Sequence, residues 1–192
     1  LCLKDRPLKK SHIFPEFLFK PLYDDRHHKY TAISTVPGKR NKKLPKGIYE
    51  KLLCADCEHL IGKNEDYASK VLFSNPNIDC EVFDDRFVFT GIEYRKFKLF
   101  QISLLWRAGV SKREEFAATN IGPHAEILRK MILAGEPGKR ARYGTLLVAS
   151  PPVMDIMNEL ITPPEELRIG NHRCFISIVT SLAWIFLTSK HA

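Results

Sequence analysis

The 192-residue chain lacks a run of about 20 apolar residues, the length that a helix needs to cross a bilayer. The longest apolar stretch, Cys174 to Leu187, is shorter and rich in β-branched and aromatic residues, so it predicts one or two buried strands. A signal peptide, an internal repeat and a low-complexity segment are also missing from the sequence. These absences favour a cytoplasmic globular protein over a membrane-spanning or secreted one.

Cysteine is scarce and odd in number: the chain has Cys2, Cys54, Cys57, Cys80 and Cys174. One C-x-x-C pair among five cysteines argues against the disulfide framework of a small secreted domain. A reducing compartment and a metal site fit this pattern better. We expect Cys80 and Cys174, which lie in predicted strands, to act as small buried hydrophobes.

Acidic residues are outnumbered, 22 against 30 Lys and Arg, which gives a net charge of +8. This excess favours an anionic partner, most commonly nucleic acid. Five basic residues gather in an exposed loop among prolines and glycines, where they would contact phosphates. They are Lys39, Arg40, Lys42, Lys43 and Lys46. The alternative is a charged loop that binds nothing.

Composition and periodicity predict an α+β protein divided at about residue 70. Residues 1–70 are polar, basic and rich in turn signals, whereas 71–192 mix helices and strands. The predicted strands cover 48–53, 71–73, 80–89, 143–149 and part of 174–187. The predicted helices cover 57–68, 94–108 and 123–134, the last two ended by Gly109 and Gly135.

Cys54 and Cys57 have the spacing at which two thiolates bind one tetrahedral Zn²⁺. Zinc needs four ligands, and Cys2 is the candidate for the third. A C-x-x-C partner of Cys2 would precede Leu1, so we expect the fourth ligand just upstream of the sequence. The alternative is that these are ordinary free cysteines.

A second signal is Ser11-His12-Ile13-Phe14-Pro15, in which a histidine ends a short predicted strand. An imidazole titrates near neutral pH, so His12 could deprotonate a water molecule. A structural or solvent-exposed histidine is the alternative.

Together these segments resemble the HNH (His-Me finger) endonucleases, which carry C-x-x-C, then Asp-His-Ile-x-Pro, then Leu-Cys-x-x-Cys-His at the start of a helix. The matching residues here are Cys2, Ser11-His12-Ile13-Phe14-Pro15 and Leu53-Cys54-Ala55-Asp56-Cys57-Glu58. The resemblance covers about the first 70 residues and implies a zinc-knuckle ββα (treble-clef) fold there. Residues 71–192 are an α+β accessory region without a motif of known chemistry, and could dock a protein partner.

The resemblance also implies roles. His12 would be the general base, and Glu58, in place of a metal-binding histidine, would hold a catalytic Mg²⁺ or Mn²⁺. Cys2, Cys54 and Cys57 would bind a structural zinc. The implied activity is hydrolysis of DNA, rather than RNA, in a context such as bacterial anti-phage defence.

Three residues depart from the family pattern: Ser11 replaces an aspartate, Tyr49 an asparagine and Glu58 a histidine. They leave open a degenerate zinc-finger module that binds nucleic acid or a protein without cutting. A subunit whose region 91–192 docks into a larger complex is a third alternative. Two further groups could supply ligands to a cation. Asp24, Asp25, His27 and His28 lie in the loop, where we favour a solvated polar turn as their interpretation. His59, Glu65 and Asp66 lie on the helix, where surface carboxylates are common.

Overall fold

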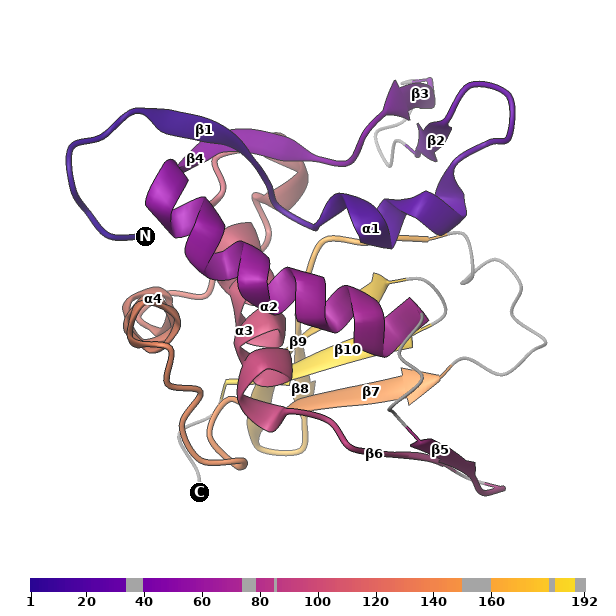
Figure 1. Ribbon diagram of the computed structural model, residues 1–192, viewed down its shortest axis with the longest axis vertical. Coiled ribbons are helices and arrows are strands. Elements are labelled where there is room, and N and C mark those ends of the chain that lie inside the picture. The colour runs from indigo at the N-terminus through magenta and orange to yellow at the C-terminus, as the bar shows by residue number, and fades with distance from the viewer. Residues whose placement is uncertain (34–39, 74–78, 85, 150–159, 180–181, 189–192) are drawn as a thin grey trace.

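Figure 1 shows the computed structural model, which describes residues 1–33, 40–73, 79–84, 86–149, 160–179 and 182–188. The protein mixes helices and strands, as the sequence predicts. A two-stranded ribbon lies along the upper edge, helix α2 (Ala55–Phe73) crosses in front of α3 (Tyr94–Val110), and a four-stranded sheet lies behind them. None of the described helices is long and apolar enough to span a membrane.

The ribbon consists of β1 (Leu8–His12) and β4 (Tyr49–Cys54), which pair antiparallel. The pairing joins Lys9 to Leu53 and Lys10 to Lys51, so one residue of β4 is left over and forms a bulge. Strand β4 runs directly into α2, which begins two residues before the predicted start. We call the ribbon and α2 together the ββα unit, although α1, β2 and β3 separate β1 from β4 in the sequence.

The connection from β1 to β4 is more ordered than the predicted loop. It forms α1 (Glu16–Phe19), a 3-10 turn (Lys20–Leu22) and the antiparallel strands β2 (Lys29–Ala32) and β3 (Lys42–Pro45). Burial explains this order, because Phe19 packs on Tyr30 with the ring centroids 4.9 Å apart. The apolar anchors turn a basic stretch that would otherwise be a loop into a hairpin.

Helix α3 is the centre of the core, as its apolar circumference predicts. Every residue from Phe97 to Ala108 is buried. The helix packs between α2 and α4 (His124–Ala134) on one side and the sheet on the other, where Phe100 meets Trp184. The buried ammonium of Lys98 donates to the carbonyls of Lys139 and Arg142 at 2.8 and 2.6 Å. These hydrogen bonds hold the segment after α4 against α3.

The sheet has the strand order β7-β10-β9-β8, with every neighbouring pair antiparallel. Its strands are β7 (Thr145–Ala149), β10 (Leu182–Leu187), β9 (His172–Val179) and β8 (Glu165–Ile169). The apolar run at 174–187 thus forms two strands, and Cys174 is buried there as expected. Strand β8, which the sequence reading missed, lies at the edge and is exposed at all five residues, so it has no apolar alternation to detect.

Two predictions of secondary structure were wrong. Residues 71–73 are the last turn of α2 and not a strand, because the helix simply continues its pattern to Phe73. Gly109 lies inside α3, which ends at Val110. A Cβ at Gly109 would lie 2.5 Å from Ile121 Cδ1, so this glycine permits close packing instead of ending the helix.

The other predicted elements are present. Strands β5 (Asp79–Val82) and β6 (Phe87–Thr90) form the expected hairpin, and a short 3-10 turn (Glu114–Phe116) follows α3. Gly135 adopts a φ of 69° and ends α4 as predicted. The side chain of Cys80 lies outside the described residues.

Candidate functional site

Three cysteines come together where the ribbon meets α2. Cys54 ends β4, Cys57 lies in the first turn of α2, and Cys2 comes from the N-terminal arm. Their Sγ atoms all lie within 4.8 Å of one another, and those of Cys2 and Cys54 are 3.7 Å apart. Two thiolates on one tetrahedral zinc lie about 3.8 Å apart. The predicted cysteine group is therefore assembled and could bind a metal ion.

Two arginines hold the N-terminal arm beside this group. Arg6 forms an ion pair with Asp56, which lies between Cys54 and Cys57 in the sequence. Arg129 on α4 donates to the carbonyl of Leu1 at 2.7 Å. The third sulfur is thus positioned by contacts on both sides of Cys2, independently of any metal.

The thiols of Cys2 and Cys57 differ in pKa. A backbone hydrogen bond from Lys4 lowers the pKa of Cys2 to about 7, whereas burial raises the pKa of Cys57 to about 11. Thiolates are the form that binds zinc, and a bound cation favours them. A metal ion would therefore offset the cost of ionising the buried Cys57.

His12 ends β1 at the opposite end of the ribbon from Cys54. Its Nε2 is buried and has no hydrogen-bond partner among the described residues, although the imidazole as a whole is 30% exposed. The nearest carboxylate is that of Glu16 on α1, whose Oε2 lies 3.9 Å from Nε2. A buried nitrogen without a partner is uncommon in proteins and is available to a water molecule or a ligand.

Glu58 lies in the first turn of α2 and is half-buried. Its Oε1 is, like the Nε2 of His12, buried without a hydrogen-bond partner among the described residues. Within the described chain, the cysteine group alone brings three His, Cys, Asp or Glu donors together. A Mg²⁺ ion commonly uses only one or two carboxylates and keeps several waters, so Glu58 remains a candidate ligand.

Glu65, the second acidic candidate on α2, is already engaged. Its Oε1 lies 2.6 Å from Nη1 of Arg107, whose side chain is only 3% exposed. The same Nη1 donates to the backbone carbonyl of His12 at 2.8 Å. Arg107 therefore ties α3 to both α2 and the end of β1.

Ser11 takes part in the pairing of the ribbon. It is fully buried, and its hydroxyl accepts the N–H of Leu53 at 2.9 Å and donates to the carbonyl of Lys9 at 3.3 Å. Leu53 stands next to the bulge, where the regular ladder is interrupted. The hydroxyl compensates for this interruption, which gives a structural reason for serine at this position.

Tyr49, which the HNH resemblance places where an asparagine is expected, stands directly opposite His12 in the ribbon. The two rings meet edge to face with their centroids 6.1 Å apart. The loop acids do not join them through any contact that the described residues show. Asp24 instead accepts Lys43 Nζ and the N–H of His27, both at 2.7 Å, so it behaves as a surface turn residue.

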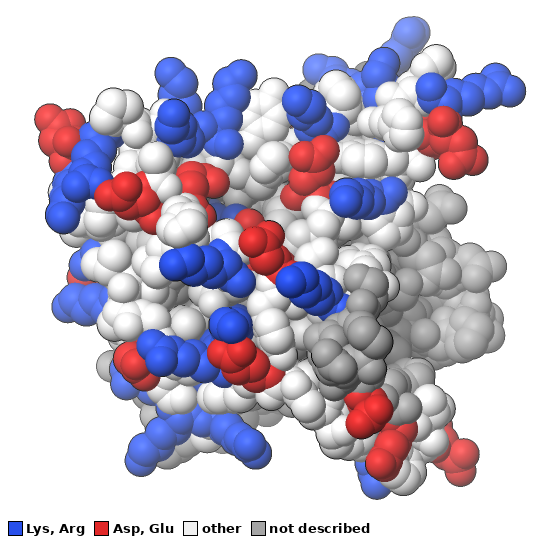
Figure 2. Space-filling model, in the orientation of Figure 1, with Lys and Arg blue, Asp and Glu red and all other residues white. Residues whose placement is uncertain are grey.

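The predicted phosphate-binding residues lie on and beside the β2–β3 hairpin. Lys42 and Lys43 belong to β3, Arg40 and Lys46 flank it, and all four are exposed. Lys39 lies outside the described residues. Figure 2 shows Lys and Arg side chains along the upper edge, over the ribbon and the hairpin. Basic residues thus continue from the hairpin onto β1 and β4.

The sequence reading missed two residues beside His12. Glu16 could have been found, because it follows His12 by four residues at the start of a helix. Arg107 could not, since its partners lie 42 and 95 positions away and nothing local distinguishes it from other helix-end arginines. Comparisons with protein-family models, curated proteins and solved structures found no match to this chain.

Proposed function

We propose that the protein is a metal-dependent endonuclease of the HNH (His-Me finger) type that hydrolyses phosphodiester bonds in DNA. The observation that carries this proposal is the ββα unit, in which β1 pairs with β4 and β4 runs directly into α2. It places a histidine at the end of the first strand, with an unpartnered buried nitrogen, and gathers three cysteines at the other end. This arrangement supports the proposal, because a treble clef would place a zinc knuckle at one end of the ribbon and a strand-end base at the other.

In this proposal His12 takes the proton of a water molecule as the water oxygen bonds to phosphorus. The bond from phosphorus to the leaving sugar oxygen breaks in the same displacement. Glu58 and Glu16 are the carboxylates available to hold Mg²⁺ or Mn²⁺, which would stabilise the charge that develops on the phosphate.

The cysteine group is assigned to zinc in the same proposal. Three thiolates are soft ligands, which suit Zn²⁺ and not Mg²⁺. They supply three of the four donors of a structural zinc site. The role of this ion is to fix the N-terminal arm, the end of β4 and the start of α2 in one arrangement.

The second candidate is a nucleic-acid-binding module that does not cut. Two observations favour it: the hydroxyl of Ser11 is used in strand pairing, and Tyr49 offers no amide. Neither residue then provides a cation ligand of the family type. The basic residues along the upper edge would still bind phosphates.

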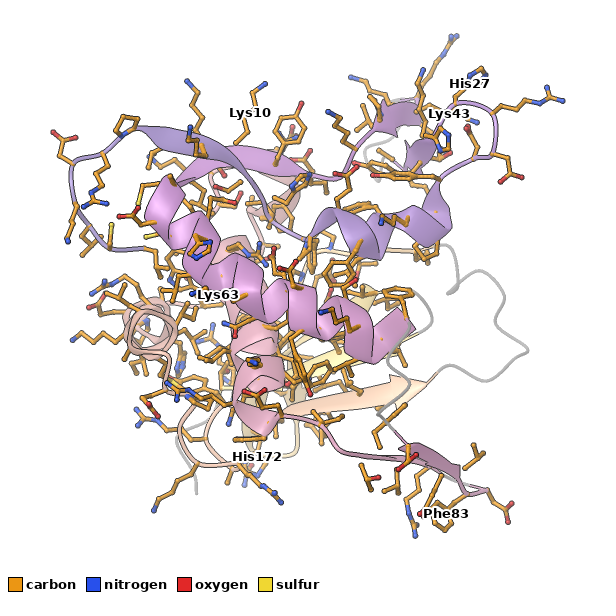
Figure 3. The ribbon with its side chains drawn as sticks, viewed as in Figure 1. Lys10, His27, Lys43, Lys63, Phe83 and His172 are labelled. Atoms are coloured by element: carbon orange, nitrogen blue, oxygen red, sulfur yellow. The ribbon has the colours of Figure 1, made fainter. Side chains whose placement is uncertain are left out.

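Plasmid cleavage with Mn²⁺ or Mg²⁺, together with a zinc assay, separates these candidates. We expect about one zinc per chain and cleavage that His12→Ala reduces by roughly 10²- to 10⁴-fold. His172→Ala is the matched control, because His172 lies at the far end of the molecule from the ribbon (Figure 3). Zinc with salt-sensitive binding but no cleavage would favour the second candidate. Cleavage that His12→Ala leaves intact would remove the assigned base.

A further inference from the structure

The outer face of the β1–β4 ribbon carries four functional side chains. Paired residues point to the same side of a ribbon, and alternate residues share a face. The register pairs Lys10 with Lys51 and His12 with Tyr49, so these four residues share one face. Lys10, Lys51 and Tyr49 are exposed, whereas Ser11 between them is fully buried on the other side.

The aromatic ring of Tyr49 contacts both a cation and the strand-end histidine. The Nζ of Lys10 lies 5.5 Å from the centroid of the Tyr49 ring, and the imidazole of His12 lies 6.1 Å from it on centroids. Tyr49 is 38% exposed although most other tyrosines of the chain are more buried. Lys10 projects outward from the ribbon in Figure 3.

The face is positive because the ribbon contributes no carboxylate to it. Glu50 is the one acidic residue in β1 and β4, and it belongs to the opposite face. Its Oε2 accepts the hydroxyl of Ser111 at 2.7 Å and the N–H of Lys112 at 3.1 Å. The negative charge of Glu50 is therefore directed toward the segment after α3.

We propose that this face binds a single strand of nucleic acid, with an unpaired base stacked on Tyr49 and the flanking phosphates on Lys10 and Lys51. Sequence-independent binding of single strands uses this combination of aromatic platforms and basic side chains. In a duplex the bases stack on one another, so a side-chain ring on a flat ribbon does not reach their faces. The inference rests on the proposed function and specifies its substrate class as unpaired nucleic acid.

The test is fluorescence anisotropy of the full chain without added divalent cations. The probes are an oligothymidine of about 12 nucleotides, the matching duplex, an abasic strand of the same length and an oligouridine. We expect the oligothymidine to bind more tightly than both the duplex and the abasic strand. The oligouridine decides whether the site takes RNA as well as DNA.

Three variants assign the effect to residues. Tyr49→Ala should weaken oligothymidine binding by roughly 5- to 100-fold and leave duplex binding unchanged, whereas Tyr49→Phe should keep the affinity. Phe83→Ala is the matched control, because Phe83 is also an exposed aromatic but lies on the β5–β6 hairpin, far from the ribbon (Figure 3). Lys10→Ala should weaken all probes and flatten the salt dependence, unlike Lys63→Ala on α2.

Equal binding of the abasic strand and the oligothymidine by the unaltered protein would overturn the inference without any variant. So would Tyr49→Ala with unchanged affinity for the oligothymidine. Either outcome can be distinguished from a failure of the proposed nuclease activity. A protein that prefers single strands but never cuts would retain the binding face and lose only the catalytic role of His12.

Discussion

At the scale of single residues, Ser11 has a local structural role in the pairing of β1 with β4. Its hydroxyl accepts the N–H of Leu53 beside the bulge, in a position that solvent does not reach. A carboxyl group in that position would have to be ionised away from water or held protonated, and either state costs free energy. The residue type at position 11 is therefore set by the pairing of β1 with β4.

Ser11→Ala tests this assignment. It removes the acceptor of a buried N–H, so the free energy of unfolding should fall by about 1–3 kcal/mol. Ser11→Asp, which introduces the residue of the HNH pattern, should be more destabilising because it buries an ionisable group. Urea unfolding measures both, with Ser69→Ala on α2 as the control. An unchanged midpoint for Ser11→Ala would contradict the structural role.

The sequence predicts the site residues that have local neighbours or belong to a motif with fixed spacing. The pair Cys54 and Cys57 and the strand-end position of His12 follow from spacing, whereas the placement of Tyr49 opposite His12 comes from the register of the ribbon. Burial is harder to predict: the unpartnered nitrogen of His12 and the ion pair of Arg107 depend on packing between distant segments. The metal, nuclease and DNA assignments stay predictions that the experiments above test.

At the scale of elements, boundaries were predicted less well than the elements themselves. The apolar pattern of α3 and the left-handed Gly135 after α4 are strong signals. The end of α2 and the role of Gly109 depend on contacts that no local signal contains, such as the approach of Ile121 to Gly109. Strand β8 escaped prediction because both of its faces are exposed.

The contact between α2 and α3 depends on the buried pair of Glu65 and Arg107. Arg107→Met leaves the carboxylate of Glu65 and the carbonyl of His12 without their partner, and should cost about 3–5 kcal/mol of unfolding free energy. Thermal or urea unfolding measures the loss.

Two comparisons make this prediction specific. Combining Arg107→Met with Glu65→Leu should recover much of the loss, because no unpaired charge remains. Lys96→Met is the matched control, since Lys96 and Glu93 form an exposed pair at the other end of α3. If the double variant were no more stable than Arg107→Met alone, the ion pair would not be the cause.

At the scale of the whole molecule, the ββα unit rests on the rest of the chain. Helix α2 buries Ile61 and Ala68 and packs along α3, and Arg107 reaches from α3 to β1. The arm that carries Cys2 is held in turn by Arg129 on α4. The predicted division at residue 70 falls within α2, near its last turn.

A fragment of residues 1–73 tests whether the unit is a domain. We expect it to lack a cooperative thermal transition without zinc, and to melt well below the full chain even with zinc, because it exposes the apolar side of α2. Circular dichroism during heating measures this. A fragment that melts with the full chain would instead support an independent N-terminal domain.

The hydrogen bond from Arg107 to the carbonyl of His12 also affects the order in which parts of the protein can fold during synthesis. The two residues are 95 positions apart in the chain, so the ribbon leaves the ribosome long before its support on α3. Before Arg107 is added to the chain, β1 and β4 can be stabilised only by their own pairing and by the cysteine group. The ribbon is therefore made before α3 but is completed only after α3 has folded against it.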